Sequence, residues 1–350
     1  MDDTGAPAAD YSLPGPWKPA RHTALVTDTD RDRALTIETW YPTDTASGES
    51  SISDMVVSET DRVTYDGLLE TAPAGCPSLT TTSAVDATPA SGTWPVIAMS
   101  HCYNCTRFST ASVAERLASW GFVAVSPDHA GNTLFDELAG SSLPLDTDTL
   151  ALREADLEFA LDRTLAGELV DGLPVDGDHV GTYGHSFGAV TAAIVLQDRL
   201  GAESAPIAGM FVAAPPENPL LPGVSMSNLD APLMFESMSE DHSVGEAGNI
   251  LIENNFNAAP STAWWFEIVD AGHLSPSDIV AITPDFMPGC GDDTRESTGE
   301  AFTYIDPVEG RALSASLAAG FFSAYVKGDA GAVDWLRTAM DDERMTAETR

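Results

Sequence analysis

The segment 179–190, HVGTYGHSFGAV, places strong limits on how this chain folds. A short apolar run typical of a strand leads directly into GHSFG, centred on Ser186, and a helix-like apolar pattern follows. A sharp turn between a strand and a helix strains its central residue, and flanking glycines remove the clashes that Cβ atoms would cause. The segment therefore predicts a serine hydroxyl that projects from a strand-to-helix turn, close to the N–H groups of the helix N-terminus.

Apolar runs and helical patterns alternate along most of the chain. We expect strands at 34–43, 94–101, 122–129, 179–186, 207–215, 232–239 and 263–273, with 263–273 as the last, and helices at 108–120, 148–168, 187–200 and 309–326. Such alternation predicts an α/β fold with a mostly parallel central sheet flanked by helices. We interpret residues 1–350 as one domain, with an extended N-terminal arm at 1–20 and a surface insertion at 44–93 that is rich in Ser, Thr, Pro and Gly.

A serine hydroxyl is a weak nucleophile unless a base accepts its proton, and histidine is the usual base. Of seven histidines, His273 lies at the C-terminal end of the segment 263–273, expected as a strand, and it lies beyond Ser186 in the chain. The base in turn needs a carboxylate to hold its tautomer. Asp241 follows the strand expected at 232–239, and we prefer it to the neighbouring Glu236 and Glu240. The predicted catalytic residues are thus Ser186, Asp241 and His273, in the order expected of a strand-to-helix nucleophile turn.

Two backbone donors are needed to stabilise an oxyanion. We expect one to be the N–H of Phe187, which follows the nucleophile, and the other to lie in the loop after His101, where Cys102 and Tyr103 are the candidates. The helix 148–168 also carries Arg153 and Asp156, which we interpret as a structural ion pair.

The chain has four cysteines, Cys76, Cys102, Cys105 and Cys290. Four cysteines allow three disulfide connectivities, and the local pair Cys102–Cys105 would leave Cys76 with Cys290. Two disulfides favour an oxidising compartment. A zinc site is disfavoured because the second CxxC or HxxxH element is missing.

The charge balance excludes several kinds of partner. Fifty-four acidic residues face 16 basic ones, for a formal net charge of −38. Such a surface repels nucleic acid and anionic membranes. No apolar run approaches the roughly 20 residues that a membrane span needs, and the N-terminus carries no recognisable leader. We expect a secreted or periplasmic monomer whose leader is absent from this sequence, with a cytoplasmic location as the alternative.

Four stretches resemble the α/β-hydrolase superfamily: MSHCYNCTRFSTASVAERLASWGFVAVSPDHAGNT, GHSFGA, PLMFESMSEDHSV and VDAGHLSPSD. Within the superfamily they are similar to platelet-activating-factor acetylhydrolases, dienelactone hydrolases and cutinase-like polyesterases. The resemblance implies that Tyr103 supplies the second oxyanion N–H and that its ring flanks the acyl pocket. We expect Tyr103, Cys102 and His185 to contact substrate. The chain departs from the pattern of these families at two places. Cys102 stands where a glycine is usual. The segment VAAPPENP, where the acetylhydrolases place their acid, contains Glu217 but no aspartate.

The resemblance implies a serine hydrolase that cleaves carboxylic esters through an acyl-enzyme, without a metal or organic cofactor. Only a short Pro-rich connection spans 215–231, where a lid helix could lie, which predicts an open cleft for short-chain or polymeric esters, polyesters included. The alternatives are a non-catalytic binding protein of the same fold, and a lipase or acetylhydrolase that acts on phospholipid-like esters.

Overall fold

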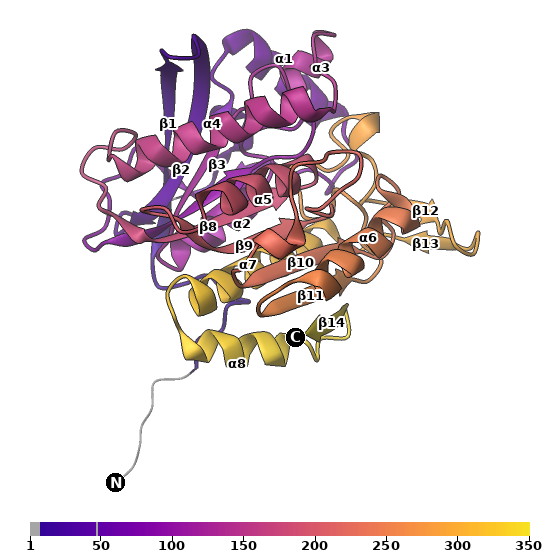
Figure 1. Ribbon diagram of the computed structural model, residues 1–350. Helices are drawn as coiled ribbons and strands as arrows, with labels where there is room; N and C mark the ends of the chain where they lie inside the picture. The colour runs from indigo at the N-terminus through magenta and orange to yellow at the C-terminus, as the bar shows by residue number, and fades with distance from the viewer. Residues whose placement is uncertain (1–7, 47) are drawn as a thin grey trace.

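The computed structural model describes residues 8–46 and 48–350, and a ten-stranded sheet runs through its centre (Figure 1). The strand order is β14-β11-β10-β9-β8-β6-β7-β2-β1-β5. The strands are β1 (Lys18–Asp28), β2 (Arg33–Thr43), β5 (Ala84–Val85), β6 (Trp94–Ser100), β7 (Val123–Pro127), β8 (Val175–His185), β9 (Pro206–Val212), β10 (Leu233–Met238), β11 (Ala263–Ile268) and β14 (Met345–Thr349). Strands β7, β6, β8, β9, β10 and β11 pair in parallel, whereas β2 and β14 join this central part antiparallel.

Helices cover both faces of the sheet. On one face lie α4 (Thr147–Leu165), α5 (Phe187–Arg199) and α6 (Gly245–Ala258), and on the other lie α2 (Ala111–Ser119), α7 (Pro307–Tyr325) and α8 (Ala330–Ala339). The strands β6 and β7 are buried along their whole length, as expected where helices cover both faces of a parallel sheet. Helix α7 begins at a proline, and the side chain of Asp306 caps it by accepting from two backbone N–H groups.

The predicted central strands and the four predicted helices are present, with ends shifted by a few residues. The prediction that 263–273 is the last strand is wrong, because β11 ends at Ile268 and β14 follows at the chain's C-terminal end. Strands β1 and β14 and helices α1 (Glu59–Thr71), α6 and α8 were not predicted from the pattern. Both missed strands are rich in polar residues and alternate poorly, because they lie toward the sheet margins and are only partly buried.

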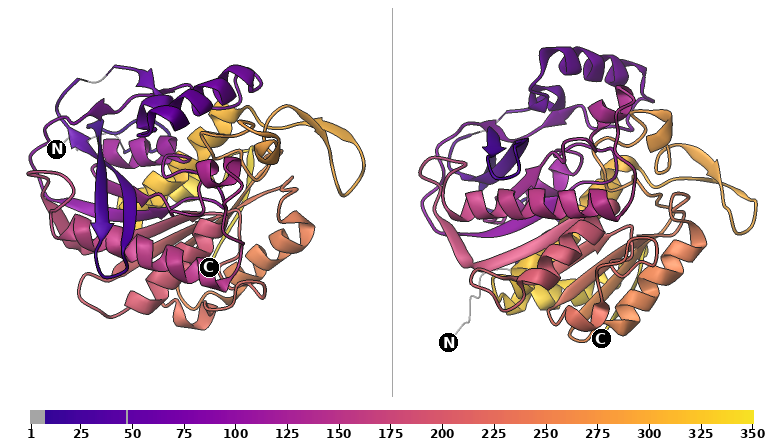
Figure 2. Two further views of the ribbon diagram at one scale, coloured as in Figure 1. Left: turned by 90° about the horizontal axis from the view of Figure 1, so that it is seen from above. Right: turned by 45° about the horizontal axis from the view of Figure 1, so that its top comes forward.

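The segment 44–93 contains helix α1, the short turn of helix η1 (Ile52–Met55) and the two-residue strands β3 (Ser50–Ser51) and β4 (Thr80–Thr81). Its Tyr65 is fully buried and packs edge-on against Phe108, with 5.6 Å between ring centroids. A disulfide joins Cys76 of this segment to Cys290, in the long segment between β11 and α7. That segment also contains the projecting hairpin of β12 (Asp292–Thr294) and β13 (Ala301–Thr303) (Figure 2).

The N-terminal arm is also attached to the body of the molecule. Tyr11 is buried, its hydroxyl donates to Asp329 at 2.8 Å, and its ring packs 4.3 Å from that of Trp120. In residues 8–46 and 48–350, no helix has the length and apolar character needed to cross a membrane.

Candidate active site

Ser186 lies between the end of β8 and the first residue of α5, at the turn predicted from the sequence. Its backbone has φ 57° and ψ −123°, a conformation that is strained for a residue with a side chain. The flanking glycines are required by close backbone approach: a Cβ on Gly184 would lie 1.9 Å from the carbonyl oxygen of Gly188, and a Cβ on Gly188 would lie 2.0 Å from that of Ser100. The turn can therefore form only with glycine at both positions.

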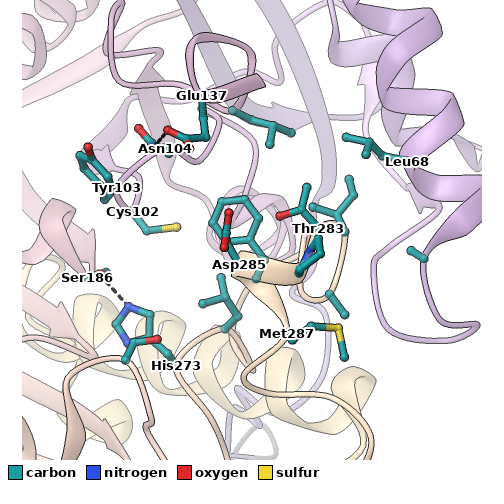
Figure 3. Close-up of a pocket in the computed structure, with 18 of the residues that line it drawn as sticks. Leu68, Cys102, Tyr103, Asn104, Glu137, Ser186, His273, Thr283, Asp285 and Met287 are labelled. Atoms are coloured by element: carbon teal, nitrogen blue, oxygen red, sulfur yellow. Dashed lines mark hydrogen bonds between the residues drawn. The ribbon is translucent and has the colours of Figure 1, made fainter. Parts of the chain in front are cut away.

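The hydroxyl of Ser186 is hydrogen bonded to a histidine that is itself held by a carboxylate. His273 Nε2 lies 2.7 Å from Ser186 Oγ, and His273 Nδ1 lies 2.7 Å from Asp241 Oδ2 (Figure 3 draws the serine–histidine bond). The three residues follow β8, β10 and β11, so the parallel sheet brings together positions that are 32 to 87 residues apart. The structure thus places all three predicted catalytic residues in one hydrogen-bonded row.

Asp241 is held in its ionised form. Burial by itself raises the pKa of this carboxyl, but the charge and hydrogen bond of His273 and the backbone N–H groups of Val244 and Ser243 lower it more, so its pKa lies below the ordinary value. The two N–H groups donate to Oδ1 at 2.9 and 3.1 Å, which leaves Oδ2 for the histidine. An ionised Asp241 fixes the proton of His273 on Nδ1 and leaves Nε2 to accept from the serine.

The other carboxylates considered for this role lie elsewhere. Glu236 is fully buried within β10, and Glu240 forms an ion pair with Arg295. Glu217 accepts from the backbone N–H of Met226 at 2.6 Å. None of them contacts His273 in the described part of the chain.

The predicted oxyanion donors flank the serine. Phe187 is the first residue of α5, so its N–H has no acceptor within the helix. Across from it, Cys102 and Tyr103 line the same cleft as Ser186, and in the described part of the chain neither backbone N–H donates to another protein group. A disulfide joins Cys102 to Cys105 and closes this loop into a short ring.

His101 supports the loop of Cys102 and Tyr103 through two hydrogen bonds. Its Nδ1 lies 2.8 Å from the carbonyl oxygen of Cys102, and its Nε2 accepts from the backbone N–H of His129 at 3.2 Å. Burial, together with the charge of Arg153, keeps the pKa of His101 well below its ordinary value, so the imidazole is neutral and donates through Nδ1. The Cys102 carbonyl and the Tyr103 N–H belong to one planar peptide unit, so this bond also fixes the direction of that N–H.

The predicted pair of Arg153 and Asp156 is wrong. Both side chains are fully buried, but Asp156 accepts from Arg33 at 2.7 Å, whereas Arg153 donates to the carbonyl of His101 and lies 4.5 Å above the ring of Phe187. A buried charge needs several partners at once, and each of these two finds them on different strands and loops. Arg153 therefore contacts both sides of the candidate oxyanion site.

A cleft of about 1190 Å³ opens in front of Ser186 and His273 (Figure 3). Its far wall comes from the C-terminal end of α1 and from residues 281–287, the two chain segments that the Cys76–Cys290 disulfide ties together. Residues 215–231, the short connection in which a lid helix could lie, do not line it. The lining is mostly apolar, with two carboxylates and, among the described residues, no lysine or arginine. Its side chains include Leu68, Ala72, Leu134, Glu137, Leu138, Leu145, Val244, Leu274, Ile282, Asp285, Phe286 and Met287.

Tyr103 and Cys102 line the cleft, as expected of substrate contacts, but His185 does not. The imidazole of His185 is fully buried, and its Nε2 lies 2.8 Å from the backbone carbonyl of His273. Burial lowers the pKa of His185 to about 3, so it is neutral and donates this bond. We therefore correct its role to that of a support for the loop that carries His273.

The sheet order, the helices on both faces and the serine at the β8–α5 turn together define the α/β-hydrolase fold. Among solved structures, the chain is similar to a ferulic acid esterase from Streptomyces cinnamoneus, with a TM-score of 0.67 over 92% of this chain and 94% of that chain. The two sequences are 19% identical, so the likeness establishes the fold alone. No protein-family model and no curated protein sequence matches this chain.

Proposed function

We propose that the protein is a serine hydrolase that cleaves carboxylic esters. The observation that carries the proposal is the hydrogen-bonded row of Ser186, His273 and Asp241 at the edge of an open cleft. The likeness of the fold to that of a ferulic acid esterase supports an ester as the substrate. A binding protein that had lost the chemistry would have no need for a complete and correctly ordered row.

In the proposed reaction, Ser186 Oγ attacks the ester carbonyl carbon while His273 Nε2 takes its proton. The N–H groups of Phe187 and Tyr103 stabilise the negative oxygen of the tetrahedral intermediate. When the intermediate collapses, the alcohol leaves with the proton from Nε2 and an acyl-serine remains. Water then attacks the acyl group with His273 again as base, and the acid is released. Asp241 stays ionised throughout and stabilises the imidazolium.

The lining of the cleft supports uncharged esters as substrates. A volume of about 1190 Å³ exceeds what a short acyl chain occupies, so the proposal covers bulky apolar and polymeric esters as well as short ones. Glu137 and Asp285 at the rim repel anionic groups, which disfavours substrates with a free carboxylate or phosphate next to the ester. The two disulfides support action outside the cytosol, in an oxidising compartment.

The test is hydrolysis of p-nitrophenyl esters from acetate to palmitate by the wild type, Ser186→Ala and the matched control Ser141→Ala. Ser141 is exposed, and its hydroxyl only donates to the carbonyl of Asp136, so its loss should leave turnover unchanged. We expect Ser186→Ala to lose about 10⁵-fold or more in kcat while its circular dichroism stays that of the wild type. Labelling by a fluorophosphonate should be lost in the same variant alone.

Unchanged turnover in Ser186→Ala would overturn the proposed mechanism. A folded wild type that hydrolyses none of these esters and takes no fluorophosphonate label would instead favour a non-catalytic binding protein.

A further inference from the structure

A second cavity, of about 570 Å³, lies between α2 and α7, away from Ser186. The N-terminal arm and the segment around residues 78–82 close its sides. Three of the chain's 16 basic residues line it, which is unusual in a molecule with 54 acidic residues. They are Lys18, Arg116 and Arg311. Hydroxyl groups of Ser78, Thr82, Ser112 and Ser119 complete the polar part of the lining.

The charge of Arg116 is only partly compensated by a carboxylate. It is partly buried on α2, and its Nη1 donates to the carbonyl of Tyr11 at 2.7 Å and to Ser316 Oγ at 3.3 Å, but it forms no ion pair with any described residue. Burial lowers the pKa of Arg116, and the nearby charge of Asp10 offsets this only in part. Desolvating a guanidinium without a counter-charge costs free energy, and an anion in the cavity would offset that cost.

Arg311 is similarly under-compensated. It is 7% exposed, and its Nη1 donates to the carbonyl of Cys76 at 2.9 Å. The nearest carboxylate, Asp278, lies 3.8 Å from its Nε and already accepts from Ser78 Oγ and from the backbone N–H and hydroxyl of Ser112. Asp278 therefore forms only a long ion pair with Arg311, while its oxygens accept hydrogen bonds from uncharged donors.

Among the described lining residues, Glu115 is the one acidic residue, and uncharged donors of the segment 81–83 hold its carboxylate. Glu115 accepts from the hydroxyls of Thr81, Thr82 and Ser83 and from two of their backbone N–H groups. The side chain of Lys18 is exposed and makes no hydrogen bond or ion pair with described residues, so its ammonium group is free to reach a ligand. The lining thus carries a net positive charge within a strongly negative protein.

We propose that this cavity binds a small anion through its carboxylate or phosphate oxygens, with Arg116, Arg311 and Lys18 as the binding residues. A guanidinium presents a planar fork of N–H donors that matches two oxygens of either group, and an ammonium adds a point charge. The bound anion would link α2, α7, the N-terminal arm and the segment 78–82.

The test is isothermal titration of the intact protein with inorganic phosphate and, separately, with malonate, in sodium chloride of matched ionic strength. We expect saturable binding of at least one of them, with one site per chain. Binding of phosphate alone would indicate a phosphoryl ligand, and binding of malonate alone would indicate a carboxylate ligand. Either result supports the proposed anion site. Arg116→Gln should weaken binding about tenfold or more, and Lys18→Gln about threefold.

Lys18→Gln is the informative variant if Arg116→Gln fails to fold, because the Lys18 side chain is exposed and forms no hydrogen bond or ion pair with the described residues. The matched control is Arg337→Gln, which removes the same charge from an exposed position on α8. Absence of saturable binding by the wild type, or equal affinities for the wild type, Lys18→Gln and Arg337→Gln, would overturn the proposal. The readout is independent of ester hydrolysis.

Discussion

His101 Nδ1 donates to the carbonyl oxygen of Cys102 across 2.8 Å, within a loop that the Cys102–Cys105 disulfide also constrains. The same peptide unit carries the N–H of Tyr103, the proposed oxyanion donor. A hydrogen bond to a peptide carbonyl polarises the unit and strengthens its N–H as a donor. In the proposed mechanism, His101 is a positioning residue that acts on the reaction through the peptide it holds.

Replacing His101 should therefore weaken stabilisation of the transition state more than substrate binding. We expect His101→Ala to lower kcat by about tenfold to a hundredfold with little change in KM. Removal of an oxyanion donor lowers kcat by roughly 10²–10³-fold, and in this variant the Tyr103 N–H is still present but loses its fixed direction. His101→Asn, whose amide can donate near the position of Nδ1, should recover part of the loss. Steady-state kinetics check this, and a rise in KM at constant kcat would contradict it.

Asp241→Asn should lower kcat by about 10³–10⁴-fold, because an amide no longer stabilises the imidazolium and permits the wrong tautomer of His273. The pKa of Asp241 lies below its ordinary value, so the carboxylate is ionised at neutral pH and the loss should persist across that range. Glu240→Gln is the matched control in the same turn, where Glu240 pairs with Arg295 instead. Equal losses in the two variants would argue against Asp241 as the partner of the histidine.

The two carboxylates of the cleft should make the enzyme discriminate by charge. We expect acetylthiocholine to be hydrolysed faster than its uncharged isostere 3,3-dimethylbutyl thioacetate, and S-acetyl-3-mercaptopropionate slower. The double variant Glu137→Gln/Asp285→Asn should reduce the cation-to-anion ratio of kcat/KM by about threefold or more at low salt. Thiol release measures all three reactions.

Glu203→Gln is the control for that experiment, because Glu203 is exposed and outside the cleft. An equal effect in the control would assign the discrimination to the net charge of −38 rather than to the cleft. Identical rates on the three thioesters would contradict the predicted charge preference, but they would remain consistent with the proposed ester hydrolysis.

Glu236 should make stability depend on pH. Burial raises the pKa of this carboxyl from 4.5 to about 8, and the nearby hydroxyl of Ser314 offsets this rise only in part. Below pH 4.5 it is protonated in both the folded and the unfolded state. Between pH 4.5 and 8 only the folded state keeps the proton, so its contribution to the free energy of unfolding is lost as the pH rises.

Glu236→Gln should remove that dependence. The free energy of unfolding of the wild type relative to the variant should fall by up to about 1.4 kcal/mol per pH unit between pH 5.5 and 7.5. Urea denaturation at the two pH values measures the difference. Parallel pH dependence in both proteins would contradict the assignment to Glu236.

Several parts of the site were predictable from short stretches of sequence. The turn around Ser186 is encoded locally, because only glycine tolerates the backbone approaches at positions 184 and 188. The central strands were predictable because burial on both faces leaves continuous apolar runs. Asp241 and His273 followed from their places after two of those strands, since parallel strands end at the same edge of the sheet. Among three possible connectivities, the proximity of Cys102 and Cys105 in the sequence favoured the cysteine pairing that the structure has.

Other features required the tertiary structure. Strand β14 is short and polar, and only its place at the edge beside β11 makes it a strand. Arg153 and Asp156 are three residues apart on one helix, a spacing that predicts a pair, yet burial forces each to collect partners from remote strands and loops.

The sequence by itself determined the fold class, the strained serine turn and the order of the three candidate catalytic residues, because these depend on backbone sterics and apolar periodicity over a few residues. Only the tertiary structure decided the far wall of the cleft, the structural role of His185 and the cavity that gathers Lys18, Arg116 and Arg311. These depend on side chains brought together from segments up to about 300 residues apart, and a buried charge or imidazole takes its role from whichever partners the packed chain supplies.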